Sequence, residues 1–447
     1  MKNKIIVFAA ILCIISGPLS AQSLMPKVKN VIENFFHTYE LKSQASVPAE
    51  FQKKTSGWWV VPLTIVKGNV IRSRPLLYFD FKRQKYLKLP LALNRNPTAV
   101  DYSSYVHSVD AYNFDLQPCY GYPGWYDDAL QYFASQPTLN NDQLFAKARA
   151  WSSKAISPIS NQLADLRSGD GYKLGFDVNA LKGKDLRSYT SAQDSAIINF
   201  ALLLKRDLHY PTIVGSMDIK YANEVMSRYH TLLCFAEEEA KKMVLPEHLY
   251  TDSILNVTRT LLESCPQNAI LLSFGDNDLY PVLYMQAAMN LRRDVYCVNY
   301  NLLGIDKYIF RATQKQFDAE GIAFDADTML YAGTRNDVLF IKDSTAGMNW
   351  SMLRQVIAKG KQDENGLRTA AINRLFLPLT SDGSFGADGE ISLEGAIYFY
   401  KNQWVLLGMI ANLNKGRVFC SHYPFSDELK GLNRFLKASG SVYIWGQ

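Results

Sequence analysis

The sequence predicts an α/β protein whose C-terminal domain contains a mostly parallel, Rossmann-like sheet. A helical-hairpin, TPR-like domain and a small N-terminal β region are expected before it. Three observations lead to this prediction. Residues 56–93 are rich in the β-branched and aromatic residues that strands favour. Helical periodicity dominates residues 124–243. From residue 253 onward, short apolar segments alternate with helical ones, as in a sheet buried on both faces.

The N-terminus has the features of a secretory signal peptide in residues 1–21. Lys2 and Lys4 precede an apolar run, and Leu19-Ser20-Ala21 forms a small-residue cleavage site. The alternative is a membrane anchor, but the run is shorter than the ~20 residues that a spanning helix needs. We therefore expect an exported protein of the periplasm or cell envelope of a Gram-negative bacterium, with no transmembrane segment in the mature chain.

Three domains are expected after the signal peptide. Residues 22–110 form a small β-rich region, with a hairpin at Lys67-Gly68-Asn69. Residues 111–250 form the helical-hairpin domain, with helical segments at 124–136, 141–156, 191–208 and 217–243 and a cap at Asn141 or Asp142. The spacing of these segments is uneven, so no strict 34-residue repeat is present.

The third domain, residues 251–447, alternates strands and helices. Its crossovers should be right-handed. Asn402 and Ser426 are the expected caps of the last two helices. Strands are expected at 268–274, 294–300, 337–342, 371–379, 391–400, 417–423 and 441–445, and helices at 279–290, 403–413 and 427–438.

The sequence Gly-Asp-Asn-Asp at residues 275–278, the GDND corner, lies where the first strand becomes a helix. Gly275 permits a sharp turn, Asn277 or Asp278 caps the helix, and Pro281 fits its first turn. Capping accounts for one polar side chain but not for three. Some of these side chains are therefore expected to face a ligand.

In an open parallel sheet, ligands bind beyond the carboxyl ends of the strands. The polar residues that follow the predicted strands are therefore the candidate ligand-binding residues, and no catalytic residue is assigned. A single histidine among them is also typical of a hydrogen-bonded structural residue. The candidates are Asp276, Asn277, Asp278, Asn299, Asp382 and His422.

Several site classes lack their motifs. The sequence contains no GxSxG, GxxxxGK[ST] or GxGxxG, so no cofactor is predicted. No metal site is predicted, because no CxxC pair occurs and residues 381–390 lack the spacing of a calcium loop. A formal charge of +6 does not favour a nucleic-acid partner. Cys297 and Cys420 are expected to be buried thiols, and any pairing of the cysteines stays open.

Residues 270–303 resemble a GDND signature of certain Bacteroidetes proteins. Those proteins carry many membrane spans and are related to transmembrane protein O-mannosyltransferases. Arg292, Asp294 and Asn299 fit the pattern, and residues 402–423 resemble a downstream helix–strand block, with Lys415-Gly416-Arg417 in place of its Arg-Pro. The resemblance implies an exported, membrane-associated accessory or recognition domain. It does not imply glycosyltransferase activity, since the membrane-embedded catalytic half has no counterpart here.

The function expected from these observations is that of an exported binding or accessory protein. Its polar-ligand cleft at the GDND corner would recognise a glycan or a protein of the envelope. One alternative is a hydrolase or transferase that uses Asp276 as base or nucleophile. Another is a structural subunit of an envelope complex.

Overall fold

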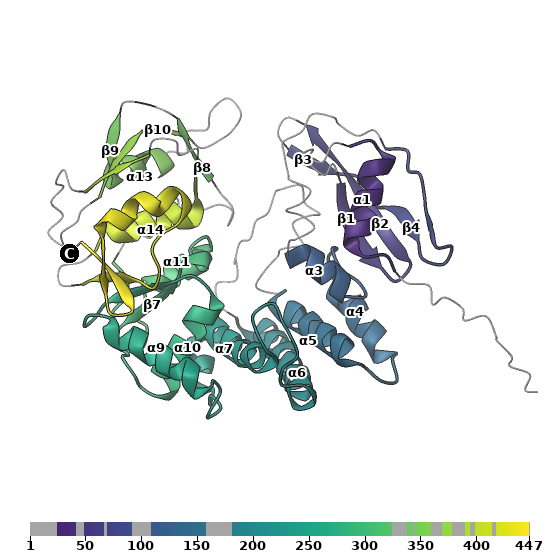
Figure 1. Ribbon diagram of the computed structural model, residues 1–447, viewed down its shortest axis with the longest axis horizontal. Helices are drawn as coiled ribbons and strands as arrows, with labels where there is room; N and C mark the ends of the chain where they lie inside the picture. Colours follow the sequence, from purple (N-terminus) through teal and green to yellow (C-terminus); the bar gives the residue numbers. More distant parts are fainter. Residues whose placement is uncertain are drawn as a thin grey trace, which may run out of the picture.

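The computed structural model describes residues 25–41, 49–66, 69–91, 109–157, 181–323, 338–342, 344, 346–358, 369–377, 389–393, 398–413 and 417–446. Figure 1 shows three parts in chain order: an N-terminal sheet with one helix, a row of helices, and a part that mixes strands and helices. The predicted signal peptide and Asp382 lie outside the described residues.

The N-terminal sheet is antiparallel, in the order β1-β2-β4-β5, with β3 also paired to β2. Helix α1 packs on it through Val28, Val31, Ile32 and Phe35, whose spacing forms one apolar helical face. The sequence did not predict this helix. At the predicted hairpin, Asn69 of β3 pairs with Val66 of β2. Residues 67–68 between them lie outside the described residues. The elements are α1 (Val28–Thr38), β1 (Ala49–Lys54), β2 (Gly57–Val66), β3 (Asn69–Arg72), β4 (Leu76–Asp80) and β5 (Lys85–Tyr86).

The central helices pack in succession, α4 on α5, α5 on α6 and α6 on α7. The cap of α5 is Asn140 rather than Asn141 or Asp142. The Asn140 side chain accepts from the backbone N–H of Gln143, and the Gln143 side chain accepts from the backbone N–H of Asn140. The helices are α3 (Val109–Leu116), α4 (Trp125–Ala134), α5 (Asn141–Ile156), α6 (Gly183–Arg206), α7 (Met217–Phe235) and α8 (Glu237–Lys242).

The prediction of a mostly parallel, Rossmann-like sheet is wrong. The largest C-terminal sheet is mixed, in the order β15-β16-β14-β6-β7. β6 is parallel to β7 and β14, but β16 is antiparallel to both β14 and β15. An apolar run shows that a strand is buried on both faces, but it does not encode the direction of the neighbouring strand. The strands are β6 (Ile270–Ser273), β7 (Tyr296–Asn299), β14 (Phe419–Ser421), β15 (Leu436–Ser439) and β16 (Val442–Trp445).

Two small three-stranded sheets complete the C-terminal part, and each combines one parallel with one antiparallel pair. The expected strand at 371–379 is divided between them, because β10 ends at Ala371 and β11 begins at Arg374. The expected strand at 391–400 is also divided, into β12 and β13. The strands are β8 (Val338–Lys342), β9 (Gly347–Asn349), β10 (Thr369–Ala371), β11 (Arg374–Phe376), β12 (Glu390–Ser392) and β13 (Tyr398–Tyr400).

The last predicted helix is also wrong. Residues Asp427–Phe435 form a 3-10 helix, η4, after which the chain enters β15. Gly440 turns β15 into β16 with φ +59°, a conformation that favours glycine. Strand pairing over Leu436–Ser439 outweighs the helical pattern of these residues. The preceding helix, α14 (Lys401–Ala411), is capped by Tyr400 instead of Asn402.

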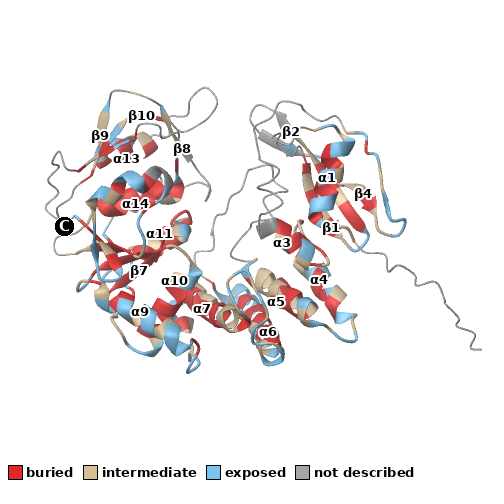
Figure 2. Ribbon diagram, in the orientation of Figure 1, coloured by how far each residue is buried: buried red, intermediate tan, exposed pale blue. Residues whose placement is uncertain are grey.

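The mixed sheet is covered on both faces, as Figure 2 shows by the buried residues around it. Ile270 and Leu272 face a cluster that includes α11 and α14, whereas Leu271 between them faces α7, α9 and α10. These layers hold the carboxyl ends of β6, β7 and β14 at one edge. The helices introduced here are α9 (Asp252–Ser264), α10 (Asp276–Ala288) and α11 (Asp306–Ala312), and α13 (Trp350–Ala358) lies beside β9 and β10.

Within the described residues, no helix combines the length and the apolar character needed to cross a membrane.

Candidate functional site

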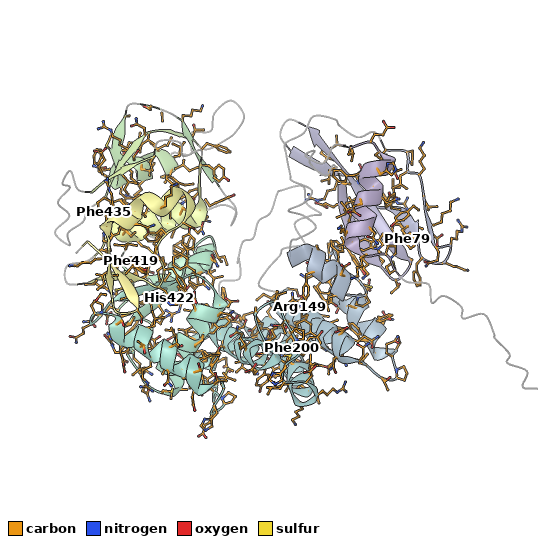
Figure 3. The ribbon with its side chains drawn as sticks, in the orientation of Figure 1. Phe79, Arg149, Phe200, Phe419, His422 and Phe435 are labelled. Carbon is orange, nitrogen blue, oxygen red and sulfur yellow. The ribbon has the colours of Figure 1, made fainter. Side chains whose placement is uncertain are left out.

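The GDND corner lies at the edge where three strands end. β6 runs directly into it, and both neighbours of β6 are parallel to it, so their carboxyl ends lie at the same edge. Asn299 is the last residue of β7, and His422 follows β14 with its backbone N–H donating to Leu272. Figure 3 shows His422 in the C-terminal part of the molecule, near Phe419 of β14. Residues far apart in the sequence therefore surround one corner.

The start of α10 differs from the predicted cap. Gly275 is the N-cap residue, and no side chain caps the helix there. Its φ of 177° is extended backbone, and an added Cβ would meet no atom within 4 Å, so the corner does not depend on glycine. Asp278 Oδ2 instead accepts from the backbone N–H of Phe274 at 3.3 Å. Pro281 lies inside the helix, beyond its first turn.

Asn277 points away from the strand ends and holds the corner against the helices. Its Nδ2 donates to the carbonyl of Val214 at 3.2 Å, and its Oδ1 accepts from Asn223 Nδ2 of α7 at 2.5 Å. The buried Asn223 side chain also accepts from the Tyr250 hydroxyl at 3.1 Å. Both ends of the Asn277 amide are therefore used by the protein, which makes Asn277 a positioning residue.

Asp276 is exposed, and its Oδ1 accepts from Asn299 Nδ2 at 3.4 Å. Asn299 is buried and held rigidly, since its backbone N–H donates to the Tyr308 hydroxyl at 2.7 Å and its Oδ1 accepts from the Asn301 backbone at 3.0 Å. Below Asp276, burial raises the pKa of Tyr250, and the negative charge of Asp276 raises it further. The Asp276 carboxylate is thus held by the amide of a buried residue.

Asp278 faces the imidazole of His422. The distance between His422 Nδ1 and Asp278 Oδ1 is 3.6 Å, slightly longer than a hydrogen bond. The rings of His422 and Tyr423 lie with their centroids 4.0 Å apart. Burial raises the pKa of Tyr423, and the charge of Asp278 and a hydrogen bond to it raise that pKa further. Asp278, His422 and Tyr423 therefore form one polar cluster beside Asp276.

A cavity of about 290 Å³ adjoins the corner, and the sequence did not predict its walls. Phe274, which directly precedes the corner, and Asn301 both line this cavity, and Asn301 Nδ2 donates to the Phe274 carbonyl at 2.6 Å. The remaining walls come from Tyr300 after β7, from Tyr400 and the start of α14, and from the segment before η4 together with Leu429 inside it. Asn402 and Ser426 were predicted from the sequence as helix caps and not as walls of a site. The lining residues are Phe274, Tyr300, Asn301, Tyr400, Asn402, Gln403, Phe425, Ser426 and Leu429.

A larger cavity, about 1000 Å³, lies elsewhere, between α8 and the end of α10. Its lining includes Tyr229, His248 and Met289 but none of the predicted site residues.

The corner suits recognition of a polar molecule. Carboxylate and amide groups supply hydrogen-bond acceptors and donors, and aromatic side chains in the adjoining cavity supply apolar faces. The His422 imidazole lies beside Asp278, at 3.6 Å from its Oδ1. Across the described parts of the chain, no group of three or more His, Cys, Asp or Glu is placed to hold a metal ion.

Comparison with known families bears on the same region. Residues 254–381 match the family model of TMEM260-associated domain 2. The match contains the GDND corner and Asn299, and it ends before α14 and His422. This match agrees with the resemblance found in the sequence as far as a family linked to TMEM260, a protein of the O-mannosyltransferase-like kind. No curated protein and no solved structure matches the chain.

Proposed function

We propose that the chain is an exported, envelope-associated binding or accessory protein that recognises a polar ligand at the GDND corner. The ligand would be a glycan or a segment of an envelope protein. We also propose that the GDND segment corresponds to the GDND segment of the multi-span Bacteroidetes proteins. The predicted signal peptide supports the expected location.

One observation carries the proposal. The exposed Asp276 carboxylate accepts from Asn299 Nδ2. Asp276 does not itself line the cavity of about 290 Å³, but Phe274, two residues before it, does, together with other aromatic and amide side chains. Tyr400 and Tyr423 at this edge are 46% and 47% exposed, so their rings are accessible to a ligand. Sugar rings and extended peptides both present apolar faces next to hydrogen-bonding groups, which such walls complement.

The competing function is a hydrolase or transferase with Asp276 as base or nucleophile. Its chemistry requires a carboxylate whose pKa or position is tuned by burial or by a charged partner. The solvent exposure of Asp276 and its hydrogen bond from the Asn299 amide support a recognition role. The two functions differ in whether the ligand is recovered unchanged.

Binding of the purified chain to immobilised glycans and to extended peptides tests the proposal. For any ligand that binds, we expect Asp276→Asn to weaken the affinity about tenfold, the effect of losing ~1.4 kcal/mol. Asp252→Asn is the matched control, because Asp252 is also the exposed first residue of a helix, α9. This control should bind as the wild type does.

Two results would contradict the proposal. If Asp276→Asn binds every ligand as tightly as the wild type does, the corner is not the recognition site. If the wild type converts a bound ligand to product and Asp276→Asn does not, the protein is an enzyme. Mass spectrometry of the recovered ligand distinguishes this second outcome from simple binding.

A further inference from the structure

Three cysteines of the C-terminal part lie on one face of the mixed sheet. Cys297 of β7 and Cys420 of β14 both pair with Leu271 of β6, one from each neighbouring strand. Cys265 ends α9, one of the helices that cover this face. All three cysteines belong to one hydrophobic cluster with Leu271, and each is 4% exposed or less. The fold therefore gathers thiols from three distant segments in its core.

The end of α9 lies against the strands that carry Cys420 and its neighbours. The Ser264 hydroxyl accepts from the backbone N–H of Ser441 at 3.1 Å, just before β16, and β16 pairs with β14. One residue later, the Cys265 thiol donates to the Leu261 carbonyl at 3.4 Å. A hydrogen bond with Cys265 raises the pKa of the Cys420 thiol, and burial raises it further. The side chains of Cys265 and Cys420 are therefore in contact between the helix and the strand.

Cys297 is placed differently and does not compete for Cys420. Its Sγ donates to Gln286 Oε1 at 3.6 Å and to the Val295 carbonyl at 3.7 Å. Neighbouring strands lie about 4.8 Å apart, so the backbones of Cys297 and Cys420, on either side of β6, are roughly 9.6 Å apart. A disulfide bond needs Cα atoms within about 7 Å of each other. Cys265 is therefore the cysteine that can be joined to Cys420.

We propose that Cys265 and Cys420 form a disulfide bond when the chain folds in an oxidising compartment. The two thiols lose two protons and two electrons, the S–S bond forms, and the disulfide of a thiol oxidoreductase accepts the electrons and becomes a dithiol. Both cysteines are buried in the finished fold, so the exchange takes place during folding, before α9 closes over the sheet. In the cell the bond rests on the proposed export, because cytosolic thiols are kept reduced.

The bond would fasten α9 to β14 and close a long loop of the chain. This loop contains the GDND corner and Asn299, and His422 follows Cys420 by two residues. Closing a loop restricts the unfolded chain more strongly as the loop lengthens. The disulfide would therefore stabilise the sheet edge that carries the corner, whatever the corner recognises.

Peptide mapping of the full chain tests the pairing. The reduced, denatured protein is refolded in a mixture of reduced and oxidised glutathione, the folded monomer is isolated, and its free thiols are blocked before digestion with trypsin. Trypsin cleaves after lysine and arginine, so the three cysteines fall in separate peptides, residues 260–292, 294–307 and 418–430. We expect 260–292 to be linked to 418–430, and this link to disappear on reduction. Unlinked peptides, or 260–292 linked to 294–307, would overturn the proposal.

Alanine variants give a second readout, the number of thiols that react with maleimide after denaturation. Refolding with oxidised glutathione should remove two reactive thiols from the wild type and none from Cys420→Ala. Cys297→Ala is the matched control, since Cys297 is 1% exposed and lies opposite the same Leu271, and it should lose two thiols as the wild type does. Loss of two thiols from Cys420→Ala as well would show that other cysteines form the bond, and would overturn the proposal.

Thermal unfolding measures what the bond does for the fold. The oxidised wild type should have a Tm about 5 °C or more above that of the reduced protein, a difference that Cys420→Ala should lack. Equal Tm values for the oxidised and reduced wild type would overturn the stabilising role. None of these assays contains a ligand of the GDND corner, so their failure is distinct from a failure of the proposed recognition.

Discussion

Single buried polar residues connect the parts of this protein. Asn223 on α7 is 5% exposed and lies between Tyr250 and Asn277, so one amide joins the helices to the GDND corner. Lys53 has a similar role at the N-terminal sheet, where its Nζ donates to the carbonyl of Phe114 at 2.7 Å. Such groups are expensive to bury and are tolerated because they are hydrogen-bonded.

Asn223→Ala is expected to reduce the free energy of unfolding by about 1–3 kcal/mol, because the Tyr250 hydroxyl and Asn277 Oδ1 lose their partner in a buried place. Chemical denaturation measures this change. Asn256→Ala, at an exposed position of α9, should change the free energy by less than about 0.5 kcal/mol. Equal effects of the two variants would show that the Asn223 hydrogen bonds do not stabilise the fold.

Lys53 makes stability depend on pH in the alkaline range. Burial lowers its pKa to about 8 from the 10.5 of an exposed lysine, with the charge of Asp115 opposing the shift. Between these values the unfolded chain binds more protons, so stability rises as the pH rises from 8 to 10.5.

The wild type should therefore gain about 3 kcal/mol relative to Lys53→Met over this range, measured by denaturation at several pH values. The exposed Lys85 provides the control, because Lys85→Met should leave the pH dependence of the wild type unchanged. If the free energies of unfolding of the wild type and Lys53→Met differ by the same amount at every pH, Lys53 is still charged at pH 10 in the folded protein.

At the scale of elements, α14 is buried along nearly its whole length, from Lys401 to Ile410. It covers one face of the mixed sheet and its first residues line the cavity beside the corner. The sequence predicted a helix here because of its apolar run, but not that this helix supplies part of the candidate site. Its stability therefore controls both the core and the cavity.

Leu407→Ala should reduce the free energy of unfolding by about 2–5 kcal/mol, because Leu407 is 1% exposed in the main core and its removal leaves a cavity. Met352→Ala on α13 is the control, since Met352 is 49% exposed. Its effect on unfolding should stay below about 1 kcal/mol. A small effect of Leu407→Ala would indicate that α14 is not firmly packed on the sheet.

At the scale of the whole molecule, one hydrophobic cluster continues from the central helices into the mixed sheet. It includes Met226 of α7, Leu283 of α10, Leu271 of β6 and Cys420 of β14. The N-terminal sheet has a separate cluster, formed by α1, the strands and α3. The central helices and the mixed sheet are therefore expected to unfold together.

Met226→Ala tests this coupling, because Met226 is fully buried where α7 meets the rest of the cluster. Amide hydrogen exchange should become faster in α7 and also in β6 and β7, whereas β1, β2 and β4 should exchange as in the wild type. Phe51→Ala, in the N-terminal cluster, should produce the reverse pattern. Faster exchange confined to α7 would show that the helices and the sheet unfold independently.

Much of the secondary structure could be predicted from local patterns. The apolar runs predicted β6, β7 and β14, and the polar residues after them were expected at a common edge; the structure has Asn299 and Asp276 in contact there. The predicted cap, Asn277 or Asp278, was wrong, because polar side chains favour the cap position and the structure has Gly275 there instead. The division of residues 371–379 between two sheets depends on partners distant in the sequence.

The sequence by itself determined where the chain is apolar, where it turns and where polar residues interrupt buried segments, because these properties depend on residues a few positions apart. Only the tertiary structure decided the directions of the strands, the pairing of Leu436–Ser439 with β16, the direction of Asn277 and the walls of the cavity. These depend on contacts between segments far apart in the sequence, such as that of Arg417 with Asn268, 149 residues away. No local pattern records the free energies of such contacts.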